Sequence, residues 1–543
     1  MLPTPSAADP GHAPEPSPTG APPSLAWTLF TGTATKYTLL IANIAIGVFL
    51  MPFTVRHLGT AEYGLWMLVA SFTYYFQLLD LGYGSGLVRH IAEADARRDL
   101  DGVNRVLSTF VLVYAVLGCL AGVGVVGITF LVIPHFPNLP PADIVRAQQL
   151  LGIMGVRIAV GFPMTVFGAV TTARQRFALN NMVALVVSVA NAVATVLVLV
   201  NGGGLVPLVS ATTAVGLASY GAYAWTARRA FPEMRIRRSL FDRTIVRDVT
   251  AFSIYLFLID VAIQIGFNLD NIVVGGVLGT TAVGIYAVAL RLADYQRQLC
   301  VQFNSLLFPV VVRLGAASQR EALRGLLIEG TRIALVLVGG VTVCLIGFGE
   351  PLVRTWMGPG FEAAVVPLYV LALTGIVLVG QGPLGNLLLG TGKHRLVAFT
   401  ALAEALANLA LSVVLIRLVG LVGVAIGTAV PILIANLGVL LPVACREAGV
   451  KPGALLRQVA LPPLIAAMPA AATCAALRML MPPDHLVGVV AEGALVGVVY
   501  LVGLVTIGFD AATRARYRSF LLRLRPQRAG APKPELRMLN SEL

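Results

Sequence analysis

Two neighbouring apolar segments each carry a row of polar side chains that could bind a solute inside a membrane. At 100° per residue, the row in 249–276 falls within about 80° of arc and the row in 285–309 within about 100°. The first row is Asp260, Gln264, Asn268 and Asn271, and the second is Arg291, Asp294, Gln298 and Gln302. Because a charge in hydrocarbon is costly, we expect both rows to line an interior cavity. A structural network, such as an Arg291–Asp294 pair, is the alternative interpretation.

Other polar groups inside apolar segments are more isolated. Lys36 and Asn43 share one face of the first apolar segment, and Arg157 lies in the fourth, so all three are further cavity candidates. Asp270 and Glu404 are isolated acids that could carry a proton or a sodium ion, or simply pair with a neighbour.

Signatures of other chemistry are absent from the sequence. It has no phosphate-binding Gly-Lys-Ser/Thr loop, which argues against an ATP-driven pump. Its six histidines are scattered, and its five cysteines lie singly in apolar runs without the spacing of a metal site. We therefore expect neither an enzyme nor a metal or other cofactor, beyond a coupling H⁺ or Na⁺.

The composition indicates a membrane protein. Hydrophobic residues make up 57% of the 543 residues and charged residues 12%, with a mean hydropathy of +0.84. Soluble chains have about 25% charged residues. The net charge of +13 would suggest nucleic-acid binding in a soluble protein, but here the basic residues lie mainly in loops, so no nucleic-acid partner is expected.

Fourteen segments are long and apolar enough to predict membrane-spanning helices. They lie near 35–53, 65–88, 107–133, 149–172, 182–201, 205–227, 249–276, 285–309, 331–349, 365–390, 397–416, 421–444, 459–481 and 487–507. The predicted fold is therefore an all-α polytopic membrane protein.

Loop charges predict its orientation. Loops after even-numbered segments are rich in Lys and Arg, and the loop after the sixth segment contains Arg228, Arg229, Arg235, Arg237, Arg238, Arg243 and Arg247. Loops after odd-numbered segments hold one arginine at most, namely Arg56, Arg146, Arg354, Arg417 and Arg478. Since positive loops stay in the cytoplasm, both termini are predicted to be cytoplasmic.

A repeated stretch divides the chain into like halves. Leu58–Trp66 and Leu278–Tyr286 both read Leu-Gly-Thr, three variable residues, Gly, an aliphatic residue and an aromatic one. Two six-helix bundles with the same orientation should be related by a pseudo-two-fold axis along the membrane normal. We expect a disordered cytoplasmic tail (1–30), a first bundle (31–228), a cytoplasmic linker (229–248), a second bundle (249–446), two appended helices (447–510) and a basic cytoplasmic tail (511–543).

Several blocks resemble one known family. They are Leu58–Trp66, Leu79–Gly84 with Arg89, Asp270–Gly275, Val283–Tyr286, Arg291-Leu292 and Gly423–Ala429. Together with the plan of twelve helices plus two, they resemble the polysaccharide transporter, or Wzx-type oligosaccharide flippase, branch of the multidrug/oligosaccharidyl-lipid/polysaccharide exporter superfamily. The resemblance covers about residues 30–510.

The resemblance implies a lipid-linked oligosaccharide substrate on undecaprenyl diphosphate, turned from the cytoplasmic to the outer leaflet of the bacterial inner membrane by alternating access, for surface polysaccharide biosynthesis. It also implies basic cavity residues for the diphosphate, for which Arg291, Lys36 and Arg157 are the candidates, and polymerase and glycosyltransferase partners. No triplet of cavity arginines is evident, which argues against the peptidoglycan-precursor branch. A cation-coupled multidrug exporter and a membrane scaffold for glycosyltransferases are the alternative functions.

Overall fold

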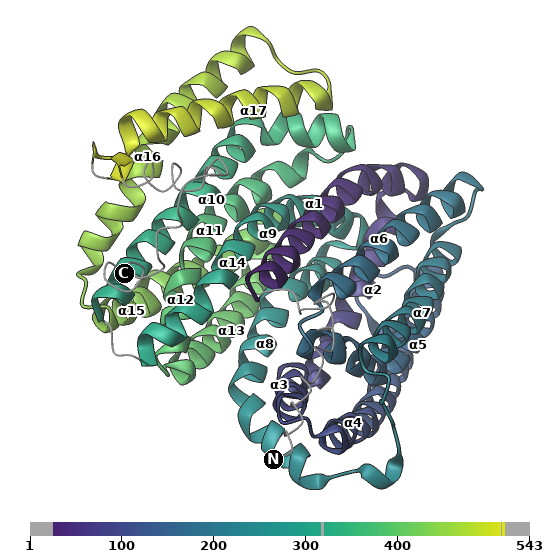
Figure 1. The fold of residues 1–543 in the computed structure, drawn as a ribbon. Helices are drawn as coiled ribbons and strands as arrows, with labels where there is room; N and C mark the ends of the chain where they lie inside the picture. The colour runs from purple at the N-terminus through teal and green to yellow at the C-terminus, as the bar shows by residue number, and fades with distance from the viewer. Residues whose placement is uncertain (1–24, 317–319, 512, 516–543) are drawn as a thin grey trace, which may run out of the picture.

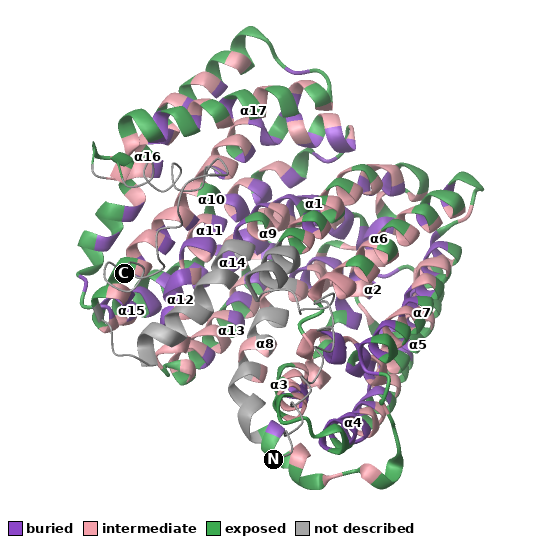
Figure 2. Ribbon diagram, viewed as in Figure 1, coloured by how far each residue is buried: buried purple, intermediate pink, exposed green. Residues whose placement is uncertain are grey.

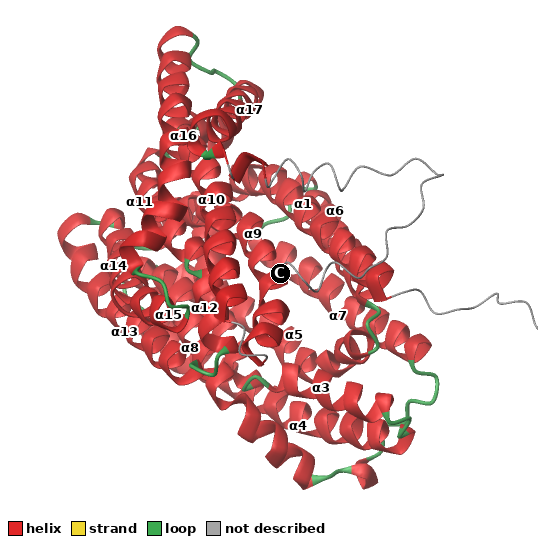
Figure 3. Ribbon diagram, turned by 60° about the vertical axis from the view of Figure 1, so that its left-hand side comes forward, coloured by secondary structure: helices red, strands yellow, loops and turns green. Residues whose placement is uncertain are grey.

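The structure is a computed structural model that describes residues 25–316, 320–511 and 513–515. Side chains are not described for 25–33, 301–316 and 320, nor for most residues between 251 and 267. All regular secondary structure in the described ranges is helical (Figure 3), as the composition predicts.

The first half runs from α1 to α7. Its helices are α1 (Leu25–Leu58), α2 (Thr60–Tyr74), a 3₁₀ segment (Tyr75–Asp80), α3 (Tyr83–Ala96), α4 (Leu100–Gly127) with a π turn (Ile128–Val132) and a 3₁₀ turn (Ile133–His135), α5 (Pro141–Ala173), α6 (Phe177–Val200) and α7 (Leu205–Ala230).

The second half follows a short 3₁₀ turn (Arg238–Leu240). Its helices are α8 (Arg243–Leu278), α9 (Thr280–Ala316), α10 (Arg320–Met357), a 3₁₀ turn (Glu362–Ala364), α11 (Val365–Gly380), α12 (Gly382–Gly390), α13 (His394–Val419), α14 (Leu421–Leu433) with a π segment (Ile434–Leu440), and α15 (Leu441–Glu447). Two appended helices follow, α16 (Pro452–Leu480) and α17 (Leu486–Gly503), the latter with a π turn (Leu504–Gly508).

Each of the fourteen predicted spans falls on one helix or on consecutive helices. In the described part of the chain, eleven helical segments are long and apolar enough to cross a membrane, which confirms a multi-pass membrane protein. Helix α2, with 15 residues, is too short to cross a membrane by itself. Helices α8 and α9 are described only in part, and of α8 the stretch Asn268–Leu278 counts as a shorter apolar helix.

Two predicted spans are not single continuous helices, although Glu362–Gly390 as a whole is long and apolar enough to cross a membrane. Within 65–88 the α-helix ends at Tyr74 and continues as a 3₁₀ helix to Asp80, and Leu81 and Gly82, with φ values of 52° and 72°, then break it. These left-handed positions interrupt a helix, and the carboxylate of Asp80 then accepts a hydrogen bond from the Gly84 amide (3.3 Å) where α3 begins. The helix expected over 365–390 breaks near Gln381, because Pro383 has no N–H to continue it.

The tails and the linker differ in part from their predicted bounds. Helix α1 begins at Leu25, so residues 25–30 are helical rather than part of the tail. The tail residues 1–24 and 516–543 lie outside the described part. The segment between α7 and α8 is held along α4, whose Asn104 accepts from the Arg235 amide (2.8 Å) and whose Ser108 accepts from the Arg237 amide (3.1 Å).

Figure 1 shows the two halves side by side, with α16 and α17 packed on the outside against α10. Tyr500 of α17 fixes this packing by donating its hydroxyl to the carbonyl of Val336 (3.0 Å). Exposed residues cover much of α16 and α17 (Figure 2), and many of them are apolar, such as Met468, Met479 and Val487. Apolar exposure of this extent suits helices that face lipid.

The two copies of the repeated stretch meet at one end of the junction between the halves. We call this end, where Gly59, Asn138 and Gly279 lie, the repeat end. A Cβ on Gly64 of α2 would overlap the carbonyl oxygen of Thr280, and a Cβ on Gly284 of α9 would overlap that of Thr60. The two copies are therefore equivalent elements in direct backbone contact, as a two-fold relation between the halves requires.

Candidate functional site

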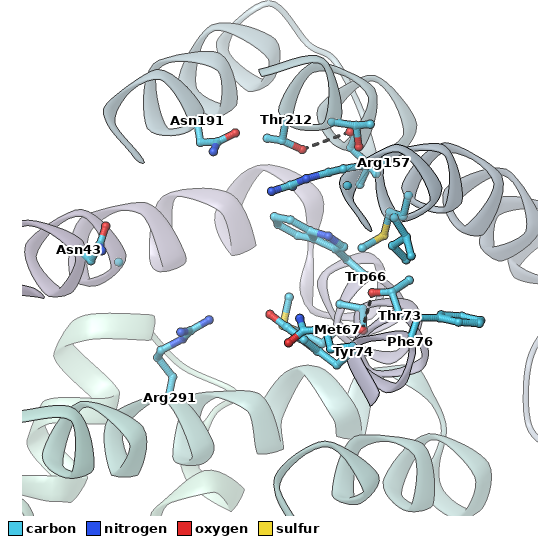
Figure 4. A pocket seen from close by; sticks show the side chains of 18 of the residues that line it. Asn43, Trp66, Met67, Thr73, Tyr74, Phe76, Arg157, Asn191, Thr212 and Arg291 are labelled. Atoms are coloured by element: carbon cyan, nitrogen blue, oxygen red, sulfur yellow. Dashed lines mark hydrogen bonds between the residues drawn. The ribbon is translucent and has the colours of Figure 1, made fainter. Parts of the chain in front are cut away.

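A cavity of about 1010 Å³ lies between the halves in the part of the chain that the structure describes. Helices α1, α2, α5, α6 and α7 of the first half supply most of its wall, together with the break after α2. The second half supplies Phe257 of α8 and Arg291, Tyr295 and Gln298 of α9. Figure 4 shows the side chains that line it, with Arg157 and Arg291 reaching in from opposite walls.

Arg291 of α9 lies near tyrosine side chains. Its guanidinium carbon lies 5.9 Å from the centre of the Tyr295 ring, and Tyr63 of α2 is close by. Asp294 instead pairs with Arg297 (2.7 Å) and accepts from Gln298 (2.5 Å). The predicted alternative of an Arg291–Asp294 ion pair is therefore wrong, and Arg291 remains available to an anion in the cavity.

Arg157 lies on the opposite wall, on α5 and among residues of α6 and α7. The absence of a side chain at Gly216 leaves room for its guanidinium, because a Cβ there would lie 2.5 Å from Nε. Asn191 of α6 and Thr212 of α7 line the same part of the cavity. Neither Arg157 nor Arg291 takes part in any of the ion pairs of the described residues.

Aromatic residues form much of the wall, and the sequence reasoning missed them. They are Tyr63, Trp66, Tyr74, Phe76, Phe162, Tyr220, Phe257 and Tyr295. Tyrosine and tryptophan combine an apolar ring face with a polar tip, so they can pack on a sugar ring and bond to its hydroxyls. An aromatic residue in an apolar segment carries no periodic signal of its own, and only the fold reveals which of them face the cavity.

Asp80 also lines the cavity, but its oxygens are engaged by the first half. Tyr114 of α4 donates its hydroxyl to one carboxylate oxygen (2.5 Å), and the Gly84 amide donates to the other (3.3 Å). These bonds stabilise the break between α2 and α3, so the role of Asp80 is to fix the backbone that lines this part of the cavity.

The remaining predicted cavity residues have different positions. Asn43 and Gln298 line the cavity, whereas Lys36 is exposed on α1 and does not line it. Asp294, Asn268 and Asn271 also lie off the wall, and Asn271 donates to Ser71 of α2 (3.0 Å) across the two halves. The side chains of Asp260, Gln264 and Gln302 lie outside the described residues.

A separate polar network surrounds Asp270 inside the second half. Asp270 is 2% exposed, and one of its oxygens accepts from Tyr286 of α9 (3.0 Å) and Thr428 of α14 (3.1 Å). Asn408 and Ser412 of α13 continue the network, since Ser412 donates to the Asn408 side-chain oxygen (2.9 Å). The network brings a carboxylate, three hydroxyls and an amide oxygen together, which are the oxygen ligands that hard cations prefer.

Glu404, the second candidate for ion coupling, lies elsewhere on α13. Its carboxylate accepts from Asn436 (3.2 Å), a buried residue in the π segment after α14. No group of three or more His, Cys, Asp or Glu side chains suited to a metal ion occurs among the residues that the structure describes.

Further contacts join the halves near the repeat end. Asn138, in the turn before α5, donates to the carbonyl oxygens of Gly276 (2.9 Å) and Val277 (3.2 Å) at the end of α8. Trp356 of α10 donates its indole N–H to the carbonyl oxygen of Val48 on α1 (2.6 Å). The Asn138 bonds, with the contacts at Gly64 and Gly284, make a closed junction at this end, and the Trp356 bond adds a link between the halves further along α1.

Comparison with known proteins gives a consistent result. The family model described as "Polysaccharide biosynthesis protein" matches residues 31–315. The chain is 22% identical over 478 residues to the uncharacterized membrane protein EpsK of Bacillus subtilis strain 168, a match that covers 86% of this chain and 92% of EpsK. It is 24% identical over 162 residues to the teichuronic acid biosynthesis protein TuaB of the same organism, which covers 30% of this chain and 33% of TuaB.

Solved structures share the fold. The lipid II flippase MurJ in an inward closed conformation aligns with a TM-score of 0.66 at 14% identity, covering 91% of this chain and 100% of MurJ. An inward-facing multidrug resistance transporter of the MATE family aligns with a TM-score of 0.62 at 15% identity, covering 77% of this chain and 96% of that transporter. At these identities the likeness concerns the fold alone, and it confirms the predicted all-α membrane architecture.

Proposed function

The chain belongs to the polysaccharide biosynthesis protein family, and we propose that it is a flippase for an undecaprenyl-diphosphate-linked oligosaccharide. It would move this repeat unit from the cytoplasmic to the outer leaflet of the bacterial inner membrane by alternating access, for surface polysaccharide biosynthesis. Both termini would be cytoplasmic, as the loop charges predict.

The observation that supports this proposal most directly is the chemistry of the cavity. A cavity of about 1010 Å³ is at the upper end of the range for drug-sized ligands, so it suits a larger solute. Arg291 offers a guanidinium with no carboxylate partner, which matches the charge of a diphosphate. Aromatic faces and hydroxyls on the other walls suit sugar rings, whose C–H faces are apolar and whose edges carry hydroxyls.

The same chemistry disfavours the cation-coupled multidrug exporter. Two guanidinium groups without carboxylate partners, Arg157 and Arg291, would repel an organic cation in a site of low dielectric. A scaffold for glycosyltransferases would need no polar cavity between its halves. Glycosyltransferases and a polymerase remain proposed partners that supply and consume the transported unit.

Ion coupling is a further part of the proposal. In a cell that is negative inside, outward movement of a diphosphate is electrically downhill, at about 2.3 kcal/mol per charge per 100 mV. A coupling H⁺ or Na⁺ is therefore not required by the loaded step, and it would act on the conformational cycle. Asp270 and Glu404 are the proposed sites, of which Asp270 has the more complete set of oxygen neighbours.

Deletion of the gene in its own organism tests the function. We expect loss of one surface polysaccharide and accumulation of its lipid-linked repeat unit on the cytoplasmic leaflet. Normal polysaccharide together with drug hypersensitivity would instead support the exporter. To distinguish a scaffold, the purified full-length chain is reconstituted in liposomes, where a flippase moves the extracted lipid-linked unit between leaflets and a scaffold does not.

A further inference from the structure

The cavity wall opposite Arg291 is built around a second cation. Arg157 lies there with two glycines that make room for it and for its neighbour. A Cβ on Gly216 would lie 2.7 Å from the guanidinium carbon of Arg157, and a Cβ on Gly161 would lie 2.5 Å from the hydroxyl of Tyr220. Tyr220 in turn donates to the backbone carbonyl of Arg157 (3.2 Å), which fixes this stretch of α5 against α7. Small residues thus provide space for a guanidinium inside the first half.

Within the described part of the protein, Arg157 has no ion-pair partner and the side-chain oxygen of Asn191 has no hydrogen-bond partner. Arg157 carries five N–H donors and takes part in no ion pair there. Asn191 of α6 also lines the cavity, and its side-chain oxygen is enclosed without a hydrogen-bond partner. Asp80, the acid on the cavity wall, is already bonded to Tyr114 and Gly84. A buried polar group without a partner is costly, so a ligand that supplies partners gains affinity.

The missing partner can be described chemically. A guanidinium requires an anion, and the side-chain amide N–H groups of Asn191, which lines the cavity, can donate to a sugar oxygen. A carboxylate-bearing sugar offers both, because its carboxylate lies next to ring hydroxyls. Thr212 on α7 adds a hydroxyl on the same wall; it donates to the Leu208 carbonyl (3.0 Å), so its oxygen can accept from a further sugar hydroxyl.

The position of Arg157 favours a sugar over the diphosphate. Arg291 lies on α9 near Tyr63 of α2, where the two halves meet. Arg157 lies among α5, α6 and α7, which all belong to the first half. With the diphosphate assigned to Arg291, the sugars that extend from it can reach the wall of the first half.

We propose that Arg157, Asn191 and Thr212 form a subsite that recognises a carboxylate-bearing sugar in the transported oligosaccharide. This inference rests on the proposed flippase function and adds the class of sugar that the cavity selects.

The composition of the polysaccharide lost on gene deletion is the first test. We expect that polymer to contain a uronic acid or another carboxylate-bearing residue. A polymer without carboxylates would overturn the subsite while leaving the flippase function intact. Loss of no polymer at all would overturn the flippase function itself, so the two failures are distinguishable.

Transport in liposomes then tests the residue. The full-length chain is reconstituted with the lipid-linked unit extracted from the deletion strain, or with the same unit after reduction of its carboxylate to a primary alcohol. Wild type should move the native unit faster by roughly tenfold or more, as expected for a lost charge-assisted hydrogen bond. Arg157→Gln should move both units at the same low rate, and Arg157→Lys should retain part of the preference.

Arg146→Gln is the matched control. Arg146 lies on the same helix, but it pairs with Glu62 (3.2 Å) and Asp143 (3.4 Å) away from the cavity wall. It should keep the full preference for the native unit. Equal transport of both units by wild type, or a preference that persists in Arg157→Gln, would overturn the subsite.

Discussion

Gly64 on α2 and Gly284 on α9 pack reciprocally, each against the carbonyl oxygen of the residue four positions before the other. The two glycines hold equivalent places in the two copies of the repeated stretch. From sequence, that stretch marks the division of the chain into like halves. In the structure it is also the place where the halves touch backbone to backbone, so glycine is required by close approach.

We therefore expect Gly64→Ala or Gly284→Ala to disfavour the state in which the repeat end is closed. Overpacking of this kind costs about 1–3 kcal/mol, enough to change a conformational equilibrium about five- to a hundredfold. The measurement is labelling of Asn43→Cys, a cavity residue, with an impermeant thiol reagent added outside, in a background without the five native cysteines. Labelling should increase if the repeat end faces outwards.

Gly152→Ala is the matched control, since a Cβ at this position on α5 meets nothing within 4 Å. The thiol reagent should label Asn43→Cys to the same extent in this variant as in the protein without the glycine substitution. Unchanged labelling in both Gly64→Ala and Gly284→Ala would show that the contact is not part of the gate.

Arg291 gives the second prediction. Arg291→Ala removes the cavity guanidinium that we assign to the diphosphate, and transport in liposomes should fall by roughly ten- to a hundredfold, the range expected for a lost charge-assisted hydrogen bond. Arg291→Lys should retain part of the activity, because lysine keeps the positive charge but lacks the planar guanidinium that can donate two parallel hydrogen bonds to a phosphate. Arg297→Ala is the control, since Arg297 pairs with Asp294 off the cavity wall. Full activity of Arg291→Ala would remove Arg291 from the site.

Much of the fold could be predicted from sequence, because hydrocarbon imposes length and composition on every spanning helix. The helix break at Leu81 and Gly82 was missed, although it contains one glycine and Gly84 follows it, because apolar residues continue on both sides. The hydropathy of a segment reports burial in lipid or protein, and it does not report the two backbone angles that end a helix.

The cavity was only partly predictable. Arg291 and Gln298 stand out as polar residues in an apolar segment, and the structure places both on the wall. Asp294 stands out in the same way, yet it turns to Arg297. Helical periodicity gives the face of a residue on its own helix, whereas the choice between a neighbour and a cavity depends on packing. For the same reason, Tyr63 and Trp66 were not identified.

Asp270 gives the third prediction. Asp270→Asn keeps the size of the side chain and an oxygen acceptor for Tyr286 and Thr428, but removes the negative charge that would bind a cation. If Asp270 couples an ion, the variant should remain folded and should lose the dependence of transport on an imposed Na⁺ or H⁺ gradient. Glu404→Gln is the parallel variant, and it identifies which acid carries the ion. Gradient dependence that persists in both variants would contradict the assignment.

The fourth prediction concerns the bond between Trp356 and Val48 across the two halves. Within α1, the carbonyl of Val48 would normally accept from the amide four residues on, but that residue is Pro52, which has no N–H. The indole N–H of Trp356 supplies the missing donor at 2.6 Å. A proline in one half thus creates a partner for a tryptophan in the other.

Trp356→Phe keeps an aromatic ring but leaves the Val48 carbonyl without a donor, which should destabilise the protein by about 1–3 kcal/mol. Pro52→Ala restores a donor within α1, so Trp356→Phe should cost much less in that background. A double-mutant cycle of thermal unfolding in detergent measures this coupling. If Trp356→Phe costs the same with Pro52 and with alanine at that position, the indole bond does not replace the missing amide. If the cycle shows coupling, transport rates of the same four proteins test whether the bond also holds the repeat end closed. If it does, Trp356→Phe should lower the transport rate only in proteins that contain Pro52.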